Sequence, residues 1–214
     1  MRTKLENVRL AVLVTDGVSP LPFHVLVRAV LDGGADMIQL REKNLSDSAF
    51  LERAKLCRQL ARDALFIVND RADIALLSQA DGVHVGPADP AIANAREAVG
   101  PDGLVGASAY TIAQLTAAQD AGADYLGVGA VFATGTKAAP VGGLSLIRAA
   151  VRAARIPLLA IGGITIDNVA SVIAAGAGAV AVSSAVIKSH DPAGATRKLK
   201  EGIAAAVRMN TDAT

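Results

Sequence analysis

The sequence has one cysteine, Cys57, no tryptophan and an aromatic content of only 3% over 214 residues. A single cysteine excludes an intramolecular disulfide, which rules out a disulfide-stapled secreted scaffold and favours a reducing, cytoplasmic location. The first ten residues, MRTKLENVRL, lack the apolar stretch and the cleavage pattern of a secretory signal. Apolar runs are interrupted by Gly, Asp or Ser before they reach the roughly 20 residues that span a bilayer, so no membrane partner is expected.

An excess of either charge is also missing. The 21 Lys and Arg residues nearly balance the 20 Asp and Glu residues, which leaves a net charge of +1. A balanced chain has no overall field that would hold nucleic acid or an anionic membrane. Any charge specificity must therefore come from local groups of residues.

Small and branched aliphatic residues are abundant instead. Hydrophobic residues make up 52% of the chain and the mean hydropathy is +0.40. This composition excludes a disordered chain and predicts dense aliphatic layers. Because 214 residues are close to the upper end of one compact domain, we predict a single domain over residues 1–214 with a polar, frayed tail from about residue 209.

Short aliphatic runs alternate with longer stretches of helical periodicity along the whole chain, which is typical of an α/β protein. Each run is apolar at nearly every position, as a strand buried on both faces should be. Eight such strands are predicted: Leu10–Val14, Met37–Leu40, Leu65–Val68, Gly82–Val85, Leu104–Ala107, Tyr125–Val128, Leu158–Ile161 and Ala179–Val182.

Eight strand–helix units in this length predict a single (β/α)8 TIM barrel, with a doubly wound open sheet as the alternative. An open sheet gathers its functional residues at one switch point. Here unusual polar residues follow strands two to eight, and this distribution favours the barrel. The segment Ala130–Gly143 is the one long interruption, and we predict that it is a mobile loop over the site.

The second strand ends in a run of alternating polar residues. Because strand residues alternate between faces, Gln39, Arg41 and Lys43 share one side while Ile38 and Leu40 face the helices. Two cations at the barrel mouth could neutralise a phosphate or diphosphate. The alternative is that both are solvated or paired with neighbouring Glu42.

Two carboxylates follow the next strands. Asp70 comes after the third predicted strand, and Asp89 comes after the fourth, in adjacent loops. Two such groups could hold one Mg²⁺, whose remaining ligands would be water and phosphate oxygens. Their structural alternatives are a helix N-cap for Asp70 and a turn for Asp89. His84 ends the fourth strand, where a lone histidine is often structural, and the chain has too few His and Cys for a zinc site.

The last two strands lead into Gly162-Gly163 and Ser183-Ser184. Loops at these two positions are the usual phosphate cradle of such barrels, because glycine lets backbone N–H groups approach an anion. The sixth strand carries Gly127 and Gly129 on one face, which leaves space for a ligand. Its loop supplies two hydroxyls and a cation in the run Thr134-Gly135-Thr136-Lys137.

Taken together, these residues resemble the thiamine phosphate synthase family. The matching segments span nearly the whole chain in family order. They are Leu13-Val14-Thr15-Asp16, Gln39-Leu40-Arg41-Glu42-Lys43, Ile67-Val68-Asn69-Asp70-Arg71, Asp73-Ile74-Ala75-Leu76, Ala80-Asp81-Gly82-Val83-His84-Val85-Gly86, Gly106-Ala107-Ser108, Ala123-Asp124-Tyr125, Thr134-Gly135-Thr136-Lys137 and Ala160-Ile161-Gly162-Gly163-Ile164.

The resemblance implies a transferase that joins hydroxymethylpyrimidine diphosphate to a thiazole phosphate, or its carboxylated form, and releases diphosphate. It also implies that Mg²⁺ is the cofactor and that the substrates are phosphorylated small molecules. The site residues that it implies are these. The pyrimidine diphosphate would contact Gln39, Leu40, Arg41, Glu42, Lys43, Asn69, His84, Ser108 and Lys137, of which Arg41, Lys43, Ser108 and Lys137 would be catalytic. The thiazole phosphate would contact Thr134, Gly135, Thr136, Gly163, Ser183 and Ser184, and Asp70 with Asp89 would bind the metal.

The sequence departs from the family pattern at Pro87, where Gln is frequent, and at Tyr110, where His is frequent. The spacing to Asp89 is kept. Two other functions remain open: a thiazole tautomerase on the same barrel, which needs an acid/base group and no metal pair, and a phosphate-ligand sensor without catalysis. A homo-oligomer is also possible.

Overall fold

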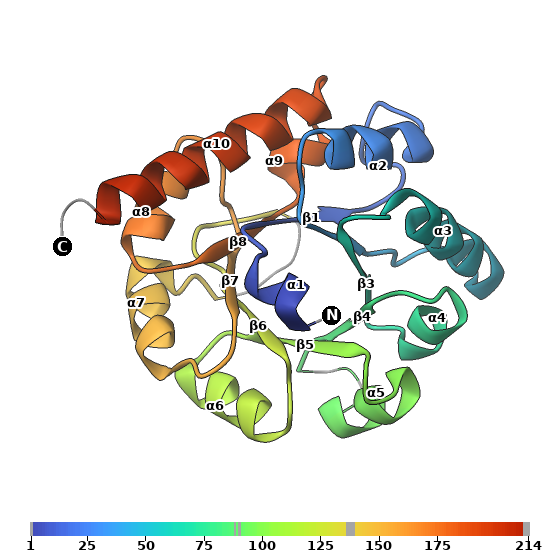
Figure 1. Cartoon of the computed structure of the whole chain (residues 1–214), viewed down its shortest axis with the longest axis horizontal. Coiled ribbons are helices and arrows are strands. Elements are labelled where there is room, and N and C mark those ends of the chain that lie inside the picture. Colours follow the sequence, from blue (N-terminus) through green and yellow to red (C-terminus); the bar gives the residue numbers. More distant parts are fainter. Residues whose placement is uncertain (1, 88, 90, 136–139, 212–214) are drawn as a thin grey trace.

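The computed structural model describes residues 2–87, 89, 91–135 and 140–211, with the backbone alone at residues 2, 3 and 211. Eight parallel strands close into a barrel in the order β1-β2-β3-β4-β5-β6-β7-β8, and helices surround it as an outer ring (Figure 1). The predicted single (β/α)8 barrel is confirmed, because the pairing of β1 with β8 closes the sheet that the alternative would leave open.

The strands are β1 (Leu10–Val14), β2 (Met37–Leu40), β3 (Leu65–Asn69), β4 (Gly82–Val85), β5 (Leu104–Ala109), β6 (Tyr125–Val128), β7 (Leu158–Ile161) and β8 (Ala179–Val182). Six match the predicted bounds. The other two, β3 and β5, continue past their apolar runs because polar residues at their ends still pair, Asn69 with His84 and Ser108 with Gly127.

The helices are α1 (Arg2–Glu6), α2 (Phe23–Asp32), α3 (Asp47–Leu60), α4 (Ala72–Leu77), α5 (Ile92–Val99), α6 (Ile112–Asp120), α7 (Gly143–Ala153), α8 (Val169–Ala174), α9 (Ser184–Ile187) and α10 (Pro192–Thr211). Ser46 caps α3 by accepting a hydrogen bond from the Ala49 N–H. Because α10 continues to Thr211, residues 209–211 of the predicted tail are helical, and residues 212–214 lie outside the described part of the chain.

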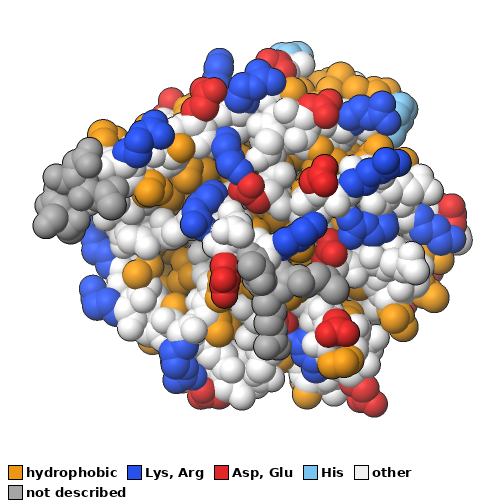
Figure 2. Space-filling model, in the orientation of Figure 1, with side chains coloured by type: hydrophobic (Ala, Val, Ile, Leu, Met, Phe, Trp, Pro, Cys, Tyr) orange, Lys and Arg blue, Asp and Glu red, His pale blue; other side chains and the backbone are white. Residues whose placement is uncertain are grey.

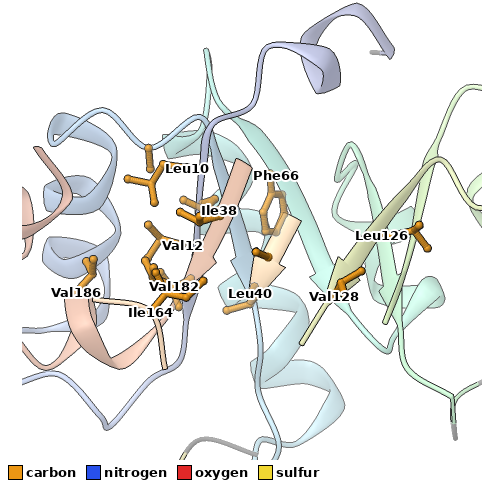
Figure 3. Packing of buried hydrophobic residues seen from close by; sticks show 14 of the residues in the cluster. Leu10, Val12, Ile38, Leu40, Phe66, Leu126, Val128, Ile164, Val182 and Val186 are labelled. Atoms are coloured by element: carbon orange, nitrogen blue, oxygen red, sulfur yellow. The ribbon is translucent and has the colours of Figure 1, made fainter. Parts of the chain in front are cut away.

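Strand alternation divides the buried side chains into two layers. One layer lies between the strands and the helices and includes Leu10, Ile38, Leu40 and Phe66 (Figure 3). The other fills the barrel and includes Met37, whose neighbour Ile38 points outward. Because successive residues of a strand face opposite layers, the inward positions near the strand ends can reach a ligand and the outward ones pack against helices.

The amino-terminal end of the barrel is closed. Helix α1 lies over the barrel axis (Figure 1), and Leu5 and Val8 are buried in the inner layer. Acidic and basic side chains are interspersed over this face (Figure 2). A ligand must therefore enter from the opposite face, where the carboxyl ends of the strands lie. None of the helices in residues 2–87, 89, 91–135 and 140–211 has the length and apolarity that a membrane crossing requires.

Candidate functional site

A cavity of about 150 Å³ opens at the carboxyl ends of the strands. Its floor is apolar and includes Leu13, Met37 and Leu159, which belong to the inner layer. Its walls carry polar groups from all round the ring. The predicted site residues that line it are Gln39, Arg41, Asn69, His84, Ser108, Thr134, Gly163, Ser183 and Ser184.

Of the residues predicted at the end of β2 to contact the substrate, only some point into the cavity. Gln39 and Arg41 line the cavity. Leu40 is fully buried in the outer layer, and Glu42 lies outside the cavity and accepts a hydrogen bond from the Asp16 N–H at 2.9 Å. The side chains of Leu40 and Glu42 therefore do not line the cavity, because alternation directs them away from the barrel interior.

Glu42 instead fastens the loop that follows β1 to the end of β2. Burial raises the pKa of Glu42, while the Asp16 N–H and the charge of Arg53 oppose that rise. A second tie comes from Thr15, whose hydroxyl donates to the carbonyl of Arg41 at 2.9 Å. These contacts fix the backbone of Arg41 and so direct its side chain.

Asp70 and Asp89 lie side by side at the rim. Asp70 follows β3 with φ of +66°, and its N–H donates to the His84 carbonyl at 2.8 Å. Asp89 accepts a hydrogen bond from the Gly86 N–H at 2.6 Å, which closes a tight turn after β4. The two carboxyl groups are also hydrogen-bonded to each other. Asp70 is not the N-cap of α4, since Arg71 occupies that position.

The electrostatics of this pair suit a cation. Burial raises the pKa of Asp70, but hydrogen bonds from Lys43 and Asp89 and the charges of Lys43 and Arg41 outweigh it and bring the pKa below its ordinary value. Burial and the neighbouring Asp70 raise the pKa of Asp89, against the Gly86 N–H and Lys43. Of the two carboxyl groups, Asp70 is therefore the readier to be ionised and Asp89 the readier to keep a proton.

Lys43 completes the rim cluster rather than the cavity wall. Its Nζ donates to Asp70 Oδ2 at 2.5 Å, and the side chain is 52% exposed. In the part of the chain that the structure describes, no group of three or more His, Cys, Asp or Glu side chains is placed to hold a metal. A metal at Asp70 and Asp89 would thus depend on water and ligand oxygens for its other positions. That donor set of hard oxygens is the one Mg²⁺ takes.

His84 forms the centre of a buried polar network. Its Nε2 lies 2.9 Å from Ser108 Oγ and its Nδ1 lies 3.2 Å from Tyr125 Oη. Tyr125 is 1% exposed and also hydrogen-bonds with Gln39. The sequence pattern did not single out Tyr125 for function, although it has the same strand parity as Gly127, which marked the inner face of β6.

The loops after β7 and β8 form a second polar wall. Gly162 and Gly163 have φ of +106° and +64°, the left-handed region that favours glycine. Asn168 holds this turn, because its Nδ2 donates to the Gly163 carbonyl and its Oδ1 accepts from the Thr165 N–H, both at 2.9 Å. Sequence reasoning missed Asn168, which lies five residues beyond the glycine pair. Ser183 donates to the Leu13 carbonyl at 3.2 Å.

The segment predicted as a mobile loop is anchored where the structure describes it. The N–H groups of Val131 and Phe132 donate to Ile161 and Gly162, each at 2.9 Å. Thr134 lines the cavity, whereas Gly135 is exposed and does not. Thr136 and Lys137 lie outside the described residues. The start of this segment is therefore a continuation of the wall built by β7.

Comparison with known proteins gives a consistent result. Residues 11–186 match the family model described as thiamine monophosphate synthase. The chain is 51% identical over 187 residues to a thiamine-phosphate synthase of Moorella thermoacetica, a match that covers 84% of this chain and 88% of that relative. It is 48% identical over 185 residues to one of Methanoculleus marisnigri, with coverages of 85% and 88%.

A solved structure is similar throughout. The thiamine phosphate pyrophosphorylase from Pyrococcus furiosus superimposes with a TM-score of 0.88 at 42% sequence identity, covering 96% of this chain and 98% of that one. A 3-hexulose-6-phosphate synthase, at 20% identity and a TM-score of 0.68, shares the barrel fold alone.

Proposed function

The chain belongs to the thiamine monophosphate synthase family, and from this premise we propose how its cavity performs the reaction. The chain is a transferase of thiamine biosynthesis that joins a pyrimidine diphosphate to a thiazole phosphate. The bond between the pyrimidine methylene carbon and the diphosphate oxygen breaks, and a bond forms between that carbon and the thiazole nitrogen. Diphosphate leaves with the electron pair, and thiamine phosphate remains.

The diphosphate binds on the side of the cavity built by β2 to β5. Arg41 offers a planar guanidinium that can grip two phosphate oxygens, and Asn69 and Ser108 add neutral hydrogen-bonding groups beside it. Lys43 adds charge from the rim. These groups stabilise negative charge that increases on the oxygens as the bond breaks, so their effect is greatest in the transition state. Lys137 stays part of the proposal on the family pattern alone.

Mg²⁺ fits the carboxylate pair at the rim. Two neighbouring carboxyl groups, one of them paired with Lys43, offer oxygen donors to a divalent ion. Asp70 and Asp89 would hold the ion, which supplies charge neutralisation for the departing diphosphate. Lys43 stays within reach of Asp70 and would contribute its charge to the same anion.

The thiazole phosphate binds against the loops after β7 and β8. The left-handed turn at Gly162 and Gly163 and the hydroxyls of Ser183 and Ser184 line this wall. In the closed ring of eight strands, β7 lies four strands from β3 in either direction. The two phosphorylated ends are thus held on opposite sides, and the reacting carbon and nitrogen meet between them over the apolar floor.

The floor has a chemical role of its own. The side chains of Leu13, Met37 and Leu159 carry no N–H or O–H group and bind no water strongly. As positive charge develops on the pyrimidine methylene, water would compete with the thiazole nitrogen for that carbon. An apolar floor below the reacting centre reduces this side reaction.

One observation carries the proposal: Arg41 and the Gly162–Gly163 turn line one apolar-floored cavity, and Asp70 of the rim pair lies close enough to Arg41 to feel its charge. Incubation of the protein with both substrates and Mg²⁺ should yield thiamine phosphate and diphosphate in equal amounts. Binding of either substrate without turnover would support the sensor instead. Isomerisation of a thiazole without added pyrimidine would support the tautomerase.

The location and assembly follow from the same proposal. Phosphorylated substrates and a single buried thiol, Cys57, are consistent with a cytoplasmic enzyme. A homo-oligomer remains a prediction, which sedimentation of the purified protein tests directly.

A further inference from the structure

Four hydrogen-bonded side chains from four strands form one chain across the inner face of the barrel. Gln39 of β2 bonds to the hydroxyl of Tyr125 on β6. Tyr125 Oη lies 3.2 Å from His84 Nδ1 on β4, and His84 Nε2 lies 2.9 Å from Ser108 Oγ on β5. All four residues border the cavity, but Ser108, at the end of this chain, is the one among them that is not buried. The chain thus connects the most deeply buried hydroxyl of the site to a group that can touch a ligand.

Two glycines make room for the rings of this chain. A Cβ at Gly106 would lie 2.1 Å from Tyr125 Cζ, and a Cβ at Gly127 would lie 3.1 Å from His84 Cε1. The two rings are 5.5 Å apart between centroids and tilted by 41°, so they meet through their polar edges rather than by stacking. Any side chain at Gly106 would displace the phenol. The sequence therefore provides space for this arrangement from two separate strands.

Hydrogen-bond stoichiometry allows the chain only two directions. A neutral imidazole has one N–H and one bare nitrogen, and a hydroxyl has one hydrogen. In the first direction Tyr125 donates to Nδ1 and Nε2–H donates to Ser108, whose own hydrogen is then left for the cavity. In the second direction Ser108 donates to Nε2 and Nδ1–H donates to Tyr125, so Ser108 presents only lone pairs to the cavity.

We infer that Tyr125 is a positioning residue that holds His84 as the Nε2–H tautomer, so that Ser108 presents its hydroxyl hydrogen to the diphosphate. The inference rests on the proposed function, because the diphosphate makes a donor useful at this position. Diphosphate oxygens are acceptors only, and they repel a hydroxyl that shows lone pairs. Tyr125 acts through His84 and Ser108 and does not itself need to touch the diphosphate.

Burial favours the uncharged forms of the groups in this chain. His84 is 7% exposed, and removal from water favours its uncharged form. Burial also raises the pKa of Tyr125, so its phenol keeps its proton, as both directions require. Gln39 can donate to the phenol oxygen through its amide N–H groups in the first direction or accept from it through its amide oxygen in the second. The need of the diphosphate for a donor at Ser108 therefore selects between the two directions.

Nitrogen-15 NMR of the imidazole tests the tautomer directly. The other two histidines, His24 and His190, are exposed, so a His24→Gln/His190→Gln variant leaves the signals of His84 alone. Long-range proton–nitrogen correlations should show a bare Nδ1 and a protonated Nε2 in this background. After Tyr125→Phe, which removes only the hydroxyl, the two nitrogen shifts should move toward each other as the tautomers mix. A protonated Nδ1 before the Tyr125 change, or unchanged shifts after it, would overturn the inference.

A binding cycle tests whether the effect reaches the ligand. Inorganic pyrophosphate with Mg²⁺ serves as the probe, measured by titration calorimetry. Tyr125→Phe and Ser108→Ala should each lower the affinity for pyrophosphate by about three- to tenfold. Because Tyr125 acts through Ser108, adding Tyr125→Phe to the Ser108→Ala variant should cause almost no further loss of pyrophosphate affinity. Additive losses would mean that Tyr125 supports the fold only and would reject the inference.

A matched control separates tautomer control from a general loss of a buried hydroxyl. Thr196 is fully buried and its hydroxyl donates to the Pro192 carbonyl at 2.7 Å within α10. Thr196→Val should lower thermal stability but leave the His84 shifts and pyrophosphate affinity unchanged. If the unmodified protein turns over both substrates but carries the Nδ1–H tautomer, this inference alone fails. If it shows the Nε2–H tautomer but no turnover, the proposed function fails instead.

Discussion

The carboxamide of Asn168 holds the carbonyl of Gly163 at 2.9 Å and so fixes the turn after β7. The same carboxamide accepts the Thr165 N–H, and Gly163 has φ of +64°. One side chain therefore determines the shape of a loop whose backbone N–H groups are available to a phosphate. This relationship makes the thiazole subsite sensitive to a residue that need not touch the ligand.

Asn168→Ala should weaken binding of the thiazole phosphate and leave binding of the pyrimidine diphosphate unchanged. The variant removes both hydrogen bonds of the turn, at a cost of about 1–2 kcal/mol in the ordered state of the loop. We expect KM for the thiazole phosphate to rise about three- to tenfold and KM for the diphosphate substrate to stay within about twofold. Asn210→Ala, which removes a side-chain hydrogen bond from α10 to the Ile173 carbonyl of α8, is the control. Equal increases in both KM values would show that the barrel mouth as a whole has been damaged.

Gly163 itself is a poorer target for this test. A Cβ there would lie 2.6 Å from the Ala133 carbonyl oxygen and 2.8 Å from Phe132 Cβ, and the positive φ disfavours a side chain. Gly163→Val would therefore disturb the wall as well as the phosphate. Ser184→Ala is cleaner, because Ser184 is exposed at the start of α9.

Asp70→Asn and Asp89→Asn should each lower kcat by roughly two orders of magnitude or more at fixed Mg²⁺, since loss of one carboxylate weakens a divalent ion at the rim. Asn is chosen because it tolerates the left-handed backbone of Asp70 as well as Asp does. Turnover at increasing Mg²⁺ and circular dichroism of the same samples check the result.

An exposed carboxylate elsewhere gives the control for this pair. Asp120 pairs with Arg155 and is 61% exposed, so Asp120→Asn should keep full activity and the same Mg²⁺ dependence. If both rim variants keep wild-type activity at low Mg²⁺, Asp70 and Asp89 do not bind the metal.

Arg41→Lys should raise KM for the diphosphate substrate or lower kcat, together by about tenfold in kcat/KM. An ammonium cannot grip two phosphate oxygens in the planar way that a guanidinium can. The Thr15 hydroxyl bond to the Arg41 carbonyl involves backbone and survives the change, so the altered head group is the main difference. Steady-state kinetics of this variant are compared with those of Arg155→Lys. Arg155 is an exposed arginine on the α7–β7 connection and serves as the control. Identical kinetics for both variants would place Arg41 outside the site.

The strand bounds follow from sequence because each strand is largely apolar and glycine follows several of the helices. Gly34, Gly122 and Gly176 do adopt positive φ after α2, α6 and α8. The ends of β3 and β5 were set too early, since Asn69 and Ser108 look like loop residues until their strand partners are known. Polar ends of this kind are characteristic of strands that reach an active site.

Parity predicts which residues of one strand face the cavity, and it correctly separates Arg41 from Leu40. It cannot predict which side chains of different strands meet. His84 and Tyr125 lie 41 positions apart, and their contact depends on the register of β4, β5 and β6 together. The hydrogen bond from Asn168 to the Gly163 carbonyl likewise depends on a turn shape that single residues do not specify.

Stability should fall at alkaline pH through the buried thiol of Cys57. Burial, with a smaller contribution from Glu42, raises the pKa of Cys57 far above its ordinary value of 9.0, against the charge of Arg53. A folded-state pKa above the unfolded one means that the folded chain keeps its proton longer. The stabilisation is then complete below about pH 9 and is lost as pH rises beyond it, by about 1.4 kcal/mol per pH unit for this one group.

Urea unfolding of the wild type and of Cys57→Ala, at steps between about pH 8 and 10, measures this contribution. Cys57→Ala lowers stability at every pH, because it removes a packed sulfur from the outer layer, so the comparison uses slopes rather than absolute values. Other groups that titrate in this range are common to both proteins and cancel. The phenol of Tyr125 adds the same kind of loss only above its ordinary value of 10.0. Parallel pH slopes for the two proteins would mean that the thiol ionises in the folded chain, and hence that water reaches it between β2 and α3.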